Sequence, residues 1–273
     1  NNFLKNELFI NFIKEYDFTF FGFIISINNK VFACSDHCRS KPIFYSYEKK
    51  NFKISNDSNL LKKNKKIREK SKIEFELSGY VTNNFTLYEN LFQLEAGSYV
   101  IYDEKTNNLV YSKYFNYLPN RYNKQYDFEY LYNDLNNRLN RIFKYIKERN
   151  NKNNFWVALS GGKDSALVLL KLIESGCKQI NAYTYGSKFN NDDAIKAKNI
   201  CKKLNINWVF IEVKAKNIDK FINSREYKDY NNFVLDNSSI PNFLDLFALI
   251  ELKNKKYLNN NSVILNGHTG DFI

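Results

Sequence analysis

Residues 155–170 read FWVALSGGKDSALVLL, and this stretch decides how the second half of the chain folds. A short apolar run, a Gly-Gly pair and a second apolar run follow one another without a break. The first run predicts a buried strand over Phe155–Leu159, and the glycines predict a tight turn. A helix over Asp164–Ser175 follows, and Gly176 ends it. Strand, glycine turn and helix therefore meet within a few residues.

The sequence around this stretch alternates between strand and helix patterns. Further apolar runs predict strands at Ile180–Tyr185, Trp208–Val213 and Ser262–Asn266. Helical periodicity predicts helices at Asp192–Leu204 and Phe243–Tyr257. Such alternation is typical of a parallel sheet with helices on both faces, because parallel strands need crossover connections. We expect a doubly wound α/β domain in residues 121–273.

The loop from Ser160 to Ser165 has the features of a phosphate site. A helix start offers unpaired backbone N–H groups and the positive end of the helix dipole, and glycines let a phosphate approach the backbone. The dipole stabilises an anion by only about 0.3–2 kcal/mol, so we expect direct contacts from both serine hydroxyls and from the ammonium of Lys163. Asp164 would repel phosphate oxygens unless a cation bridges them or the carboxylate holds the loop. We therefore expect Mg²⁺ beside it.

The spacing of the loop separates it from two other phosphate motifs. The Walker A loop needs Gly-x-x-x-x-Gly-Lys-Ser/Thr and the dinucleotide turn needs Gly-x-Gly-x-x-Gly, and neither fits. A Gly-Gly turn that joins strand and helix by chance is the structural alternative. The hexapeptide resembles the signature of the ATP pyrophosphatase (PP-loop) family, whose members cleave ATP between the α- and β-phosphates. The resemblance implies ATP and Mg²⁺ as cofactors and a pyrophosphate cradle formed by Ser160, Gly161, Gly162, Asp164 and Ser165.

The same resemblance implies further site residues at the carboxyl edge of the sheet, where the strand-to-helix loops converge. It implies adenine contacts from Thr184, Tyr185 and Gly186, at the end of the second strand. A buried strand end with a terminal glycine is the structural alternative. The resemblance also implies a part for Asp193 in binding ATP, although Asp192 and Asp193 open a helix and N-capping is the plainer role.

A second motif follows the last predicted strand. Asp271 resembles the acidic residue of the second pyrophosphate and Mg²⁺ motif in asparagine synthetases. The resemblance implies Asp164 and Asp271 as metal ligands, and Lys163, Asp164 and Asp271 as catalytic residues. The family usually shows carboxylates where this chain has His268 and Phe272, which indicates a divergent substrate. A loop aspartate without a role is the alternative for Asp271.

The first half of the chain has the pattern of short β-strands. The pair Asn28-Asn29 predicts a hairpin between the strands Phe18–Ile27 and Lys30–Ser35. Other short strands are predicted at Pro42–Tyr47, Phe52–Ser55, Ser98–Tyr102 and Leu109–Ser112. Over residues 128–146 the apolar residues recur at three- and four-residue steps, which predicts an amphipathic helix. We therefore expect an antiparallel module in residues 1–120 and a domain boundary near its end.

Segments of this module resemble the glutaminase domain of asparagine synthetases. Residues 35–46 read SDHCRSKPIFYS and resemble that domain's Asp-Arg-x-Gly-x-Lys-Pro-Leu-Tyr-Tyr segment. Thr86–Leu91 and Leu94–Gly97 resemble its closing Thr-Leu-x-x-x-Ile and Leu-x-Pro-Gly patterns. The resemblance implies an Ntn-type, glutaminase-like α+β domain followed by a pyrophosphatase domain that is truncated at its C-terminal end. A packing scaffold, with residues 35–46 as a mere strand turn, is the alternative.

The cysteines bear on the amine donor. In that family the glutamine-cleaving nucleophile is an N-terminal cysteine, which its own α-amine activates. No cysteine precedes Cys34, which falls in a predicted strand, so we do not expect this chain to hydrolyse glutamine. Because the chain contains no methionine and stops just after an apolar run, we interpret it as an internal fragment. Ammonia then comes from glutamine through a missing front end or from solution, or another amine replaces it.

Composition bounds the partners. No run approaches the roughly 18 to 20 apolar residues of a membrane helix, so we expect a cytoplasmic protein without a membrane partner. The net charge of +12 favours a polyanion, but basic residues are spread along the chain as in AT-rich genomes, and we expect no nucleic acid. The cluster Cys34–Cys38 lacks a second Cys/His pair for zinc. A homodimer stays open.

These patterns together predict a carbon–nitrogen ligase similar to the glutamine-hydrolysing asparagine synthases of asparagine biosynthesis. Adenylation turns a carboxylate oxygen into a leaving group, and the loop stabilises charge on the departing pyrophosphate. We expect a small-molecule carboxylate, either aspartate or a divergent acid such as a sugar acid, to be adenylated and then amidated. Two alternatives stay open: a tRNA-modifying PP-loop enzyme, which would use the basic charge, and an ATP-binding pseudoenzyme or assembly subunit.

Overall fold

The computed structural model describes residues 6–15, 21–116, 127–150, 154–234 and 236–268. By their contacts the residues divide into two units, one made of residues 1–120 and 229–241 and the other of residues 121–228 and 242–273. From the sequence we predicted that residues 229–241 belong to the second domain, whereas their contacts place them in the first unit. The assignment of the halves as glutaminase-like and pyrophosphatase domains stays a prediction. None of the helices that the structure describes is both long and apolar enough to cross a lipid bilayer.

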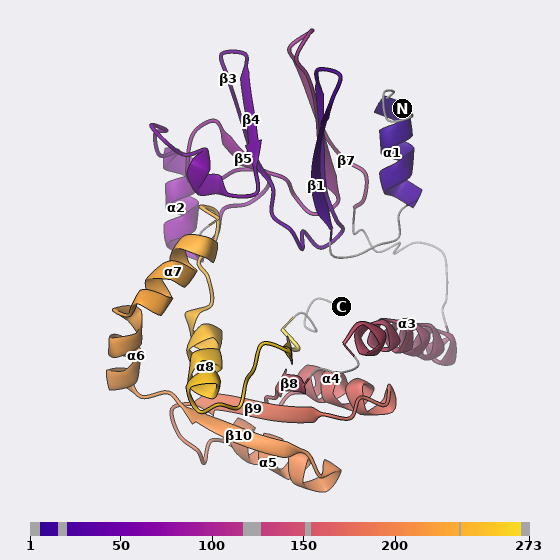
Figure 1. The fold of residues 1–273 in the computed structure, drawn as a ribbon, viewed down its shortest axis with the longest axis vertical. Coiled ribbons are helices and arrows are strands. Elements are labelled where there is room, and N and C mark those ends of the chain that lie inside the picture. Colours follow the sequence, from indigo (N-terminus) through magenta and orange to yellow (C-terminus); the bar gives the residue numbers. More distant parts are fainter. Residues whose placement is uncertain (1–5, 16–20, 117–126, 151–153, 235, 269–273) are drawn as a thin grey trace. The chain divides into compact units, whose positions relative to one another are not determined.

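The first unit is built on two antiparallel sheets (Figure 1). The four-stranded sheet has the order β1-β2-β6-β7, with bounds Gly22–Ile27, Lys30–Ser35, Ser98–Asp103 and Asn108–Lys113. The three-stranded sheet has the order β4-β3-β5, with bounds Asn51–Ser55, Phe44–Glu48 and Leu91–Gln93. Asn28 and Asn29 form the turn between β1 and β2 with φ of 50° and 63°, a left-handed conformation that asparagine tolerates. The predicted hairpin is therefore confirmed.

Helices that the sequence did not predict complete this unit. The helix α1, Asn6–Glu15, buries Phe9 and Ile13 against Phe32 of β2 and Tyr99 of β6. The helix α2, Glu69–Ser78, and a 3-10 turn at Ser58–Leu60 lie between β4 and β5. The predicted strand Phe18–Ile27 begins at Gly22 in the structure, and residues 18–20 lie outside the described part of the chain.

The segment Asp236–Pro241 belongs to the first unit through buried polar contacts. Asn237 Nδ2 donates a hydrogen bond to Ser58 Oγ at 2.6 Å, and Ser238 Oγ donates to Gln93 Oε1 at 3.0 Å. These bonds join residues 179 and 145 positions apart in sequence. A periodic pattern reports only on neighbours in the chain, so it could not have predicted this return.

The second unit is a parallel sheet between two layers of helices. The strand order is β10-β9-β8-β11, with bounds Asn207–Glu212, Ile180–Gly186, Asn154–Ala158 and Ser262–Leu265. The helices are α3 Phe128–Arg149, α4 Lys163–Glu174, α5 Asp192–Leu204, α6 Ala215–Ile222, α7 Arg225–Val234 and α8 Phe243–Asn254, of which α7 ends within the segment grouped with the first unit. The predicted antiparallel module followed by an α/β parallel sheet is confirmed.

Alternate residues of the strands face the two helix layers. Phe155 and Val157 of β8 pack with residues of α3, α4 and α5, whereas Trp156 packs with residues of α6 and α8. The helices α5 and α8 accordingly lie on opposite sides of β9 and β10 (Figure 1). An apolar run without polar alternation is what a strand buried on both faces requires.

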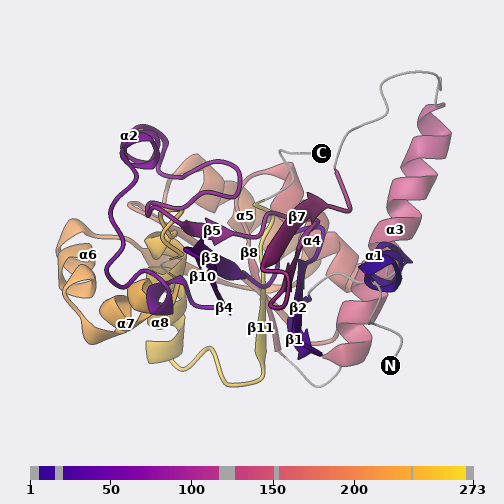
Figure 2. The same cartoon turned by 90° about the horizontal axis from the view of Figure 1, so that it is seen from above.

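The strand order creates a switch point between β8 and β11. The strands β8, β9 and β10 follow one another outward, and the chain then returns to place β11 on the other side of β8. Figure 2 shows β11 beside β8. In open parallel sheets, ligands bind at the carboxyl ends of the strands where the order reverses. The loop after β8 and the residues after β11 meet at this point, so the topology itself indicates a site there.

Candidate functional site

The glycine loop between β8 and α4 is closed by its own serines. Ser160 N donates to Ser165 Oγ at 3.1 Å, the two hydroxyl oxygens lie 3.0 Å apart, and Gly162 N donates to Ser160 Oγ at 3.1 Å. Thr184 Oγ1 of β9 donates to Leu159 O at 2.6 Å, which ties the loop to the next strand. In this state the hydroxyls that we expected to contact phosphate hold the loop in shape.

Two glycines allow the loops to come together. A Cβ on Gly161 would lie 2.6 Å from Asp193 Oδ1, at the start of α5, and 3.1 Å from Asp193 Cα. A Cβ on Gly267 would lie 2.7 Å from Ser165 N in the first turn of α4. The loops after β8 and β11 and the start of α5 therefore approach more closely than residues with a Cβ would permit.

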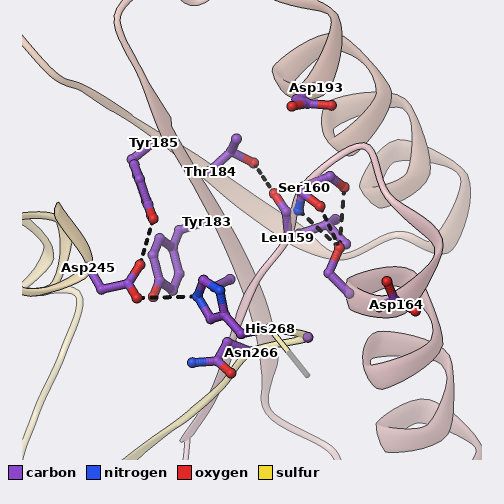
Figure 3. Close-up of a pocket in the computed structure, with 13 residues that line it drawn as sticks. Leu159, Ser160, Asp164, Tyr183, Thr184, Tyr185, Asp193, Asp245, Asn266 and His268 are labelled. Atoms are coloured by element: carbon purple, nitrogen blue, oxygen red, sulfur yellow. Dashed lines mark hydrogen bonds and ion pairs between the residues drawn. The ribbon is translucent and has the colours of Figure 1, made fainter. Parts of the chain in front are cut away.

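A cavity of about 390 Å³ opens where these loops meet (Figure 3). Of the predicted site residues, those that line it are Ser160, Asp164, Ser165, Thr184, Tyr185 and Asp193. Four predicted residues do not line it: Gly161, Gly162, Lys163 and Gly186. Lys163 is the exposed first residue of α4, and a Cβ on Gly186 would lie 2.8 Å from Asn191 Nδ2. Asp271 lies outside the described residues.

The wall opposite the glycine loop carries residues that the sequence analysis did not choose. Asp245, in the first turn of α8, accepts a hydrogen bond from Tyr185 Oη at 2.6 Å, and its other oxygen lies 3.2 Å from His268 Nε2 (Figure 3). Asn242 Nδ2 donates to that second oxygen at 3.1 Å. Burial raises the pKa of Tyr185 and of Tyr183 well above the usual value for tyrosine, and the charge of Asp245 adds to the effect. Both phenols therefore stay protonated near neutral pH.

Nothing in the sequence singled out Asp245. The helix α8 is apolar on most of its surface, so its periodicity does not tell which residue reaches the sheet edge. The available signal was the pair Asn242 and Asp245, an N-cap with an acidic residue in the first turn, which more often indicates a capped helix than a site.

The oxygen donors at the cavity suit a hard cation. Asp164 and Asp193 both line it, and carboxylates are the ligands that Mg²⁺ prefers. Among the described residues there is no group of three or more His, Cys, Asp or Glu side chains that could hold a metal ion. A Mg²⁺ site made with Asp271 would involve a residue outside that part of the chain.

The cluster Cys34–Cys38 in the first unit has a structural role. Asp36 is fully buried and accepts hydrogen bonds from the backbone N–H groups of Phe21, Cys38 and Ser40. Burial alone would raise the pKa of Asp36, but these hydrogen bonds hold it below its ordinary value. The carboxylate thus organises the turn.

Comparison with known proteins gives one family match. Residues 152–273, which hold the cavity, match the family model for asparagine synthase. No curated protein matches the chain. This match supports an ATP-dependent, amide-forming ligase of the ATP pyrophosphatase class for these residues.

The solved structures that are similar to parts of the chain include two NAD synthetases. One is an NH3-dependent NAD synthetase from Campylobacter jejuni in complex with nitrate, with 18% identity, a TM-score of 0.36, and coverage of 50% of this chain and 56% of that chain. The other is a glutamine-dependent NAD+ synthetase from Acinetobacter baumannii in complex with ADP, with 19% identity, a TM-score of 0.31, and coverage of 62% of this chain and 29% of that chain. This chain thus spans less than two thirds of each of them.

Proposed function

We propose that the chain is an ATP-dependent, amide-forming ligase, on the premise that residues 152–273 match the family model for asparagine synthase. It adenylates a carboxylate, releases pyrophosphate, and passes ammonia or another amine to the acyl-adenylate. The observation that carries the proposal is the glycine loop at the switch point between β8 and β11, on the wall of a cavity of about 390 Å³.

The pyrophosphate group of ATP occupies the loop in this proposal. Because the hydroxyls of Ser160 and Ser165 already hydrogen-bond within the loop, we assign them to keeping its shape. The direct contacts then come from the N–H groups of the first turn of α4 and from the ammonium of Lys163. These donors stabilise the charge that develops on pyrophosphate as it leaves.

The adenosine part of ATP lies toward the end of β9. The hydroxyl of Thr184 uses its one proton within the protein, since it donates to Leu159 O at 2.6 Å, and it accepts from Trp208 Nε1 at 2.9 Å. In this proposal the adenine is contacted by the backbone of Tyr185, which lines the cavity, and by that of Gly186, the next residue along β9, while Asp193 lies on the cavity wall. Thr184 acts by fixing the strand end to the loop.

Three aspartates on the cavity wall make a divalent cation necessary for a polyanionic ligand. Asp164, Asp193 and Asp245 would repel the phosphates of ATP in the absence of a counterion. We assign Asp164 and Asp271 to Mg²⁺, which when bound supplies positive charge to the pyrophosphate oxygens.

The acyl substrate is aspartate or a divergent acid such as a sugar acid. His268 lines the cavity. The asparagine synthetase family usually has a carboxylate at this position, and the difference supports a divergent acid as the substrate. The ammonia comes from glutamine or from solution. In this proposal the first unit, with its antiparallel sheets, corresponds to the glutaminase-like domain.

Exchange of labelled pyrophosphate into ATP tests the proposal directly. The chain is incubated with ATP, Mg²⁺ and each member of a panel of carboxylic acids that begins with L-aspartate and includes hexuronic acids. We expect at least one acid to give exchange, and we expect EDTA and Lys163→Ala each to abolish most of it. Glu212→Gln, in a residue that does not line the cavity, is the matched control.

Two other outcomes would replace the proposal. Binding of ATP without exchange for any acid would favour the ATP-binding pseudoenzyme or assembly subunit. Release of pyrophosphate only in the presence of tRNA would favour a tRNA-modifying enzyme.

A further inference from the structure

A chain of three hydrogen-bonding side chains crosses the cavity wall that faces the glycine loop. Tyr185 Oη, the carboxylate of Asp245 and the imidazole of His268 are joined at 2.6 and 3.2 Å (Figure 3). They come from β9, from the first turn of α8 and from the residues after β11, so three elements of the fold contribute to one arrangement. All three residues line the cavity together with Ser160 and Asp164.

Among the polar atoms of these three side chains, one ring nitrogen of His268 has no partner in the part of the protein that the structure describes. Asp245 Oδ1 accepts from Tyr185, and Asp245 Oδ2 faces both His268 Nε2 and the amide of Asn242. The carboxylate is thereby fixed and orients the imidazole. His268 Nδ1 has no hydrogen-bond partner within the described residues, and the side chain is 51% exposed. An imidazole that a carboxylate holds by one nitrogen, with the other nitrogen free, has the form of an oriented general base.

The amide-forming step requires such a base. When the nitrogen of an amine bonds to the acyl carbon of an acyl-adenylate, the bond between that carbon and the AMP oxygen breaks, and AMP leaves with the electron pair. The nitrogen must also lose a proton, or the amine is the better leaving group and the intermediate reverts. A proton acceptor on the wall opposite the pyrophosphate loop would therefore commit the intermediate to the amide.

We infer that His268 accepts the proton of the attacking amine, with Asp245 and Tyr185 as positioning residues. The inference rests on the proposed function and adds to it the residue that makes the second half-reaction productive. The proton passes from the amine nitrogen to His268 Nδ1 and then to solvent. The imidazolium that results is stabilised by the carboxylate of Asp245.

The other titratable groups at the cavity fit this division of roles. Tyr183 and Tyr185 cannot accept a proton near neutral pH, because burial raises the pKa of both phenols. Asp164 on α4 and Asp193 on α5 line the same cavity on the side of the glycine loop, where the metal and phosphates are proposed to lie.

Separating the half-reactions tests the inference. In His268→Gln the first half-reaction, pyrophosphate exchange, is measured at a saturating concentration of the best acid of the panel and serves as the reference for the second half-reaction. Amide formation from ammonium chloride falls by about 10²-fold or more, the size expected for the loss of a general base. Hydroxamate formation from hydroxylamine falls much less, because the nitrogen of the hydroxylamine adduct is more acidic than that of the ammonia adduct and loses its proton to water without a positioned base. The control is His37→Gln, which changes the other histidine of the chain, in the first unit.

Chemical rescue separates proton transfer from a structural role. In His268→Ala, added imidazole restores amide formation in proportion to its concentration and leaves exchange unchanged, and Asp245→Asn lowers amide formation without being rescued. Unimpaired amide formation in His268→Gln beside normal exchange, or the absence of rescue in His268→Ala, would overturn the inference alone. Absence of exchange in the unaltered chain would overturn the proposed function and this inference with it.

Discussion

Gly267 is the residue at which two loops of the cavity touch. A Cβ there would lie 2.7 Å from Ser165 N and 2.9 Å from the carbonyl carbon of Asp164. These are backbone atoms of the first turn of α4, so they cannot rotate aside as a flexible side chain would. We predict that Gly267→Ala destabilises the second unit by about 1–3 kcal/mol and weakens ATP binding, since it displaces the start of α4. Thermal unfolding and ATP titration measure the two effects.

Gly162→Ala is the matched control for stability. The nearest atom to a Cβ at this position is Ser160 Oγ, at 3.2 Å, and the φ of −83° suits any residue. Its free energy of unfolding should change by less than about 1 kcal/mol, the size of an altered N-cap. Equal losses of stability in the two variants would contradict the assignment of Gly267 as the point of closest approach.

Asp36 makes the stability of the first unit depend on pH. Because backbone N–H groups hold its pKa below the ordinary value, the unfolded chain binds a proton more readily than the folded one. The stability that Asp36 contributes is therefore present above the pKa of the unfolded state and is lost as the pH falls through the folded pKa. In Asp36→Asn, we predict a loss of about 1.5–3 kcal/mol near neutral pH, the usual worth of hydrogen bonds to a charged group, and a flatter stability curve below about pH 4. Urea unfolding at several pH values measures both, and a parallel acid limb in the variant would refute the role.

At the scale of single residues, the sequence predicted one side of the cavity better than the other. Ser160, Asp164 and Ser165 stand in one contiguous motif, and a motif between a strand and a helix is readable without the fold. Asp245 and His268 meet only because α8 and β11 fold onto the same sheet edge. Tertiary contacts of that kind leave no periodic trace in the sequence.

Helices and strands whose apolar residues follow a clear helical or strand spacing were predicted with bounds correct to within a few residues. The helix α5 has the predicted bounds Asp192–Leu204, whereas α8 ends at Asn254 rather than at the predicted Tyr257. The helix α6 spans only 8 residues, so the helical spacing of its apolar residues extends over little more than two turns. The helix α7 contains only three aromatic residues and one valine among polar ones. Short and polar helices depend on tertiary contacts, which the sequence alone does not reveal.

The segment Asp236–Pro241 is an element without regular structure that nevertheless helps to hold the first unit together. Asn237 is 2% exposed, has a φ of 58°, and bonds to Ser58. We predict that Asn237→Ala costs about 1–3 kcal/mol, because it removes the buried hydrogen bond to Ser58 Oγ and places alanine in a left-handed conformation. Asn237→Gly should cost less, since glycine tolerates that conformation and only the hydrogen bond is lost.

Urea unfolding of these variants measures the contribution of the segment. Asn232→Ala, in an exposed residue of α7, is the control and should change the free energy of unfolding by less than about 0.5 kcal/mol. A cost for Asn237→Gly as large as that for Asn237→Ala would show that backbone strain plays no part.

For the molecule as a whole, the distribution of charge distinguishes the proposed ligase activity from that of an enzyme that acts on RNA. The chain carries a net charge of +12, and a hollow in the first unit is lined by Lys49, Lys53, Lys63 and Lys65. The cavity of the second unit is different: its described lining contains three aspartates and neither lysine nor arginine. Phosphates of an RNA strand would be repelled there, whereas a small Mg²⁺–ATP complex would be accepted.

Any RNA that the basic hollow attracts should therefore take no part in the proposed reaction. We predict that tRNA changes the rate of acid-dependent pyrophosphate exchange by less than about twofold, and that RNA binding weakens steeply between about 50 and 200 mM salt while exchange does not. Replacing Lys49 and Lys63 together by asparagine should weaken RNA binding and leave exchange intact; asparagine suits position 49, where φ is 48°, because it tolerates the left-handed region. Filter binding of labelled tRNA and the exchange assay, run on the same samples, measure the two properties. Exchange that requires tRNA, or that falls with the lysines, would instead make RNA the substrate and the acidic cavity an incomplete description of the site.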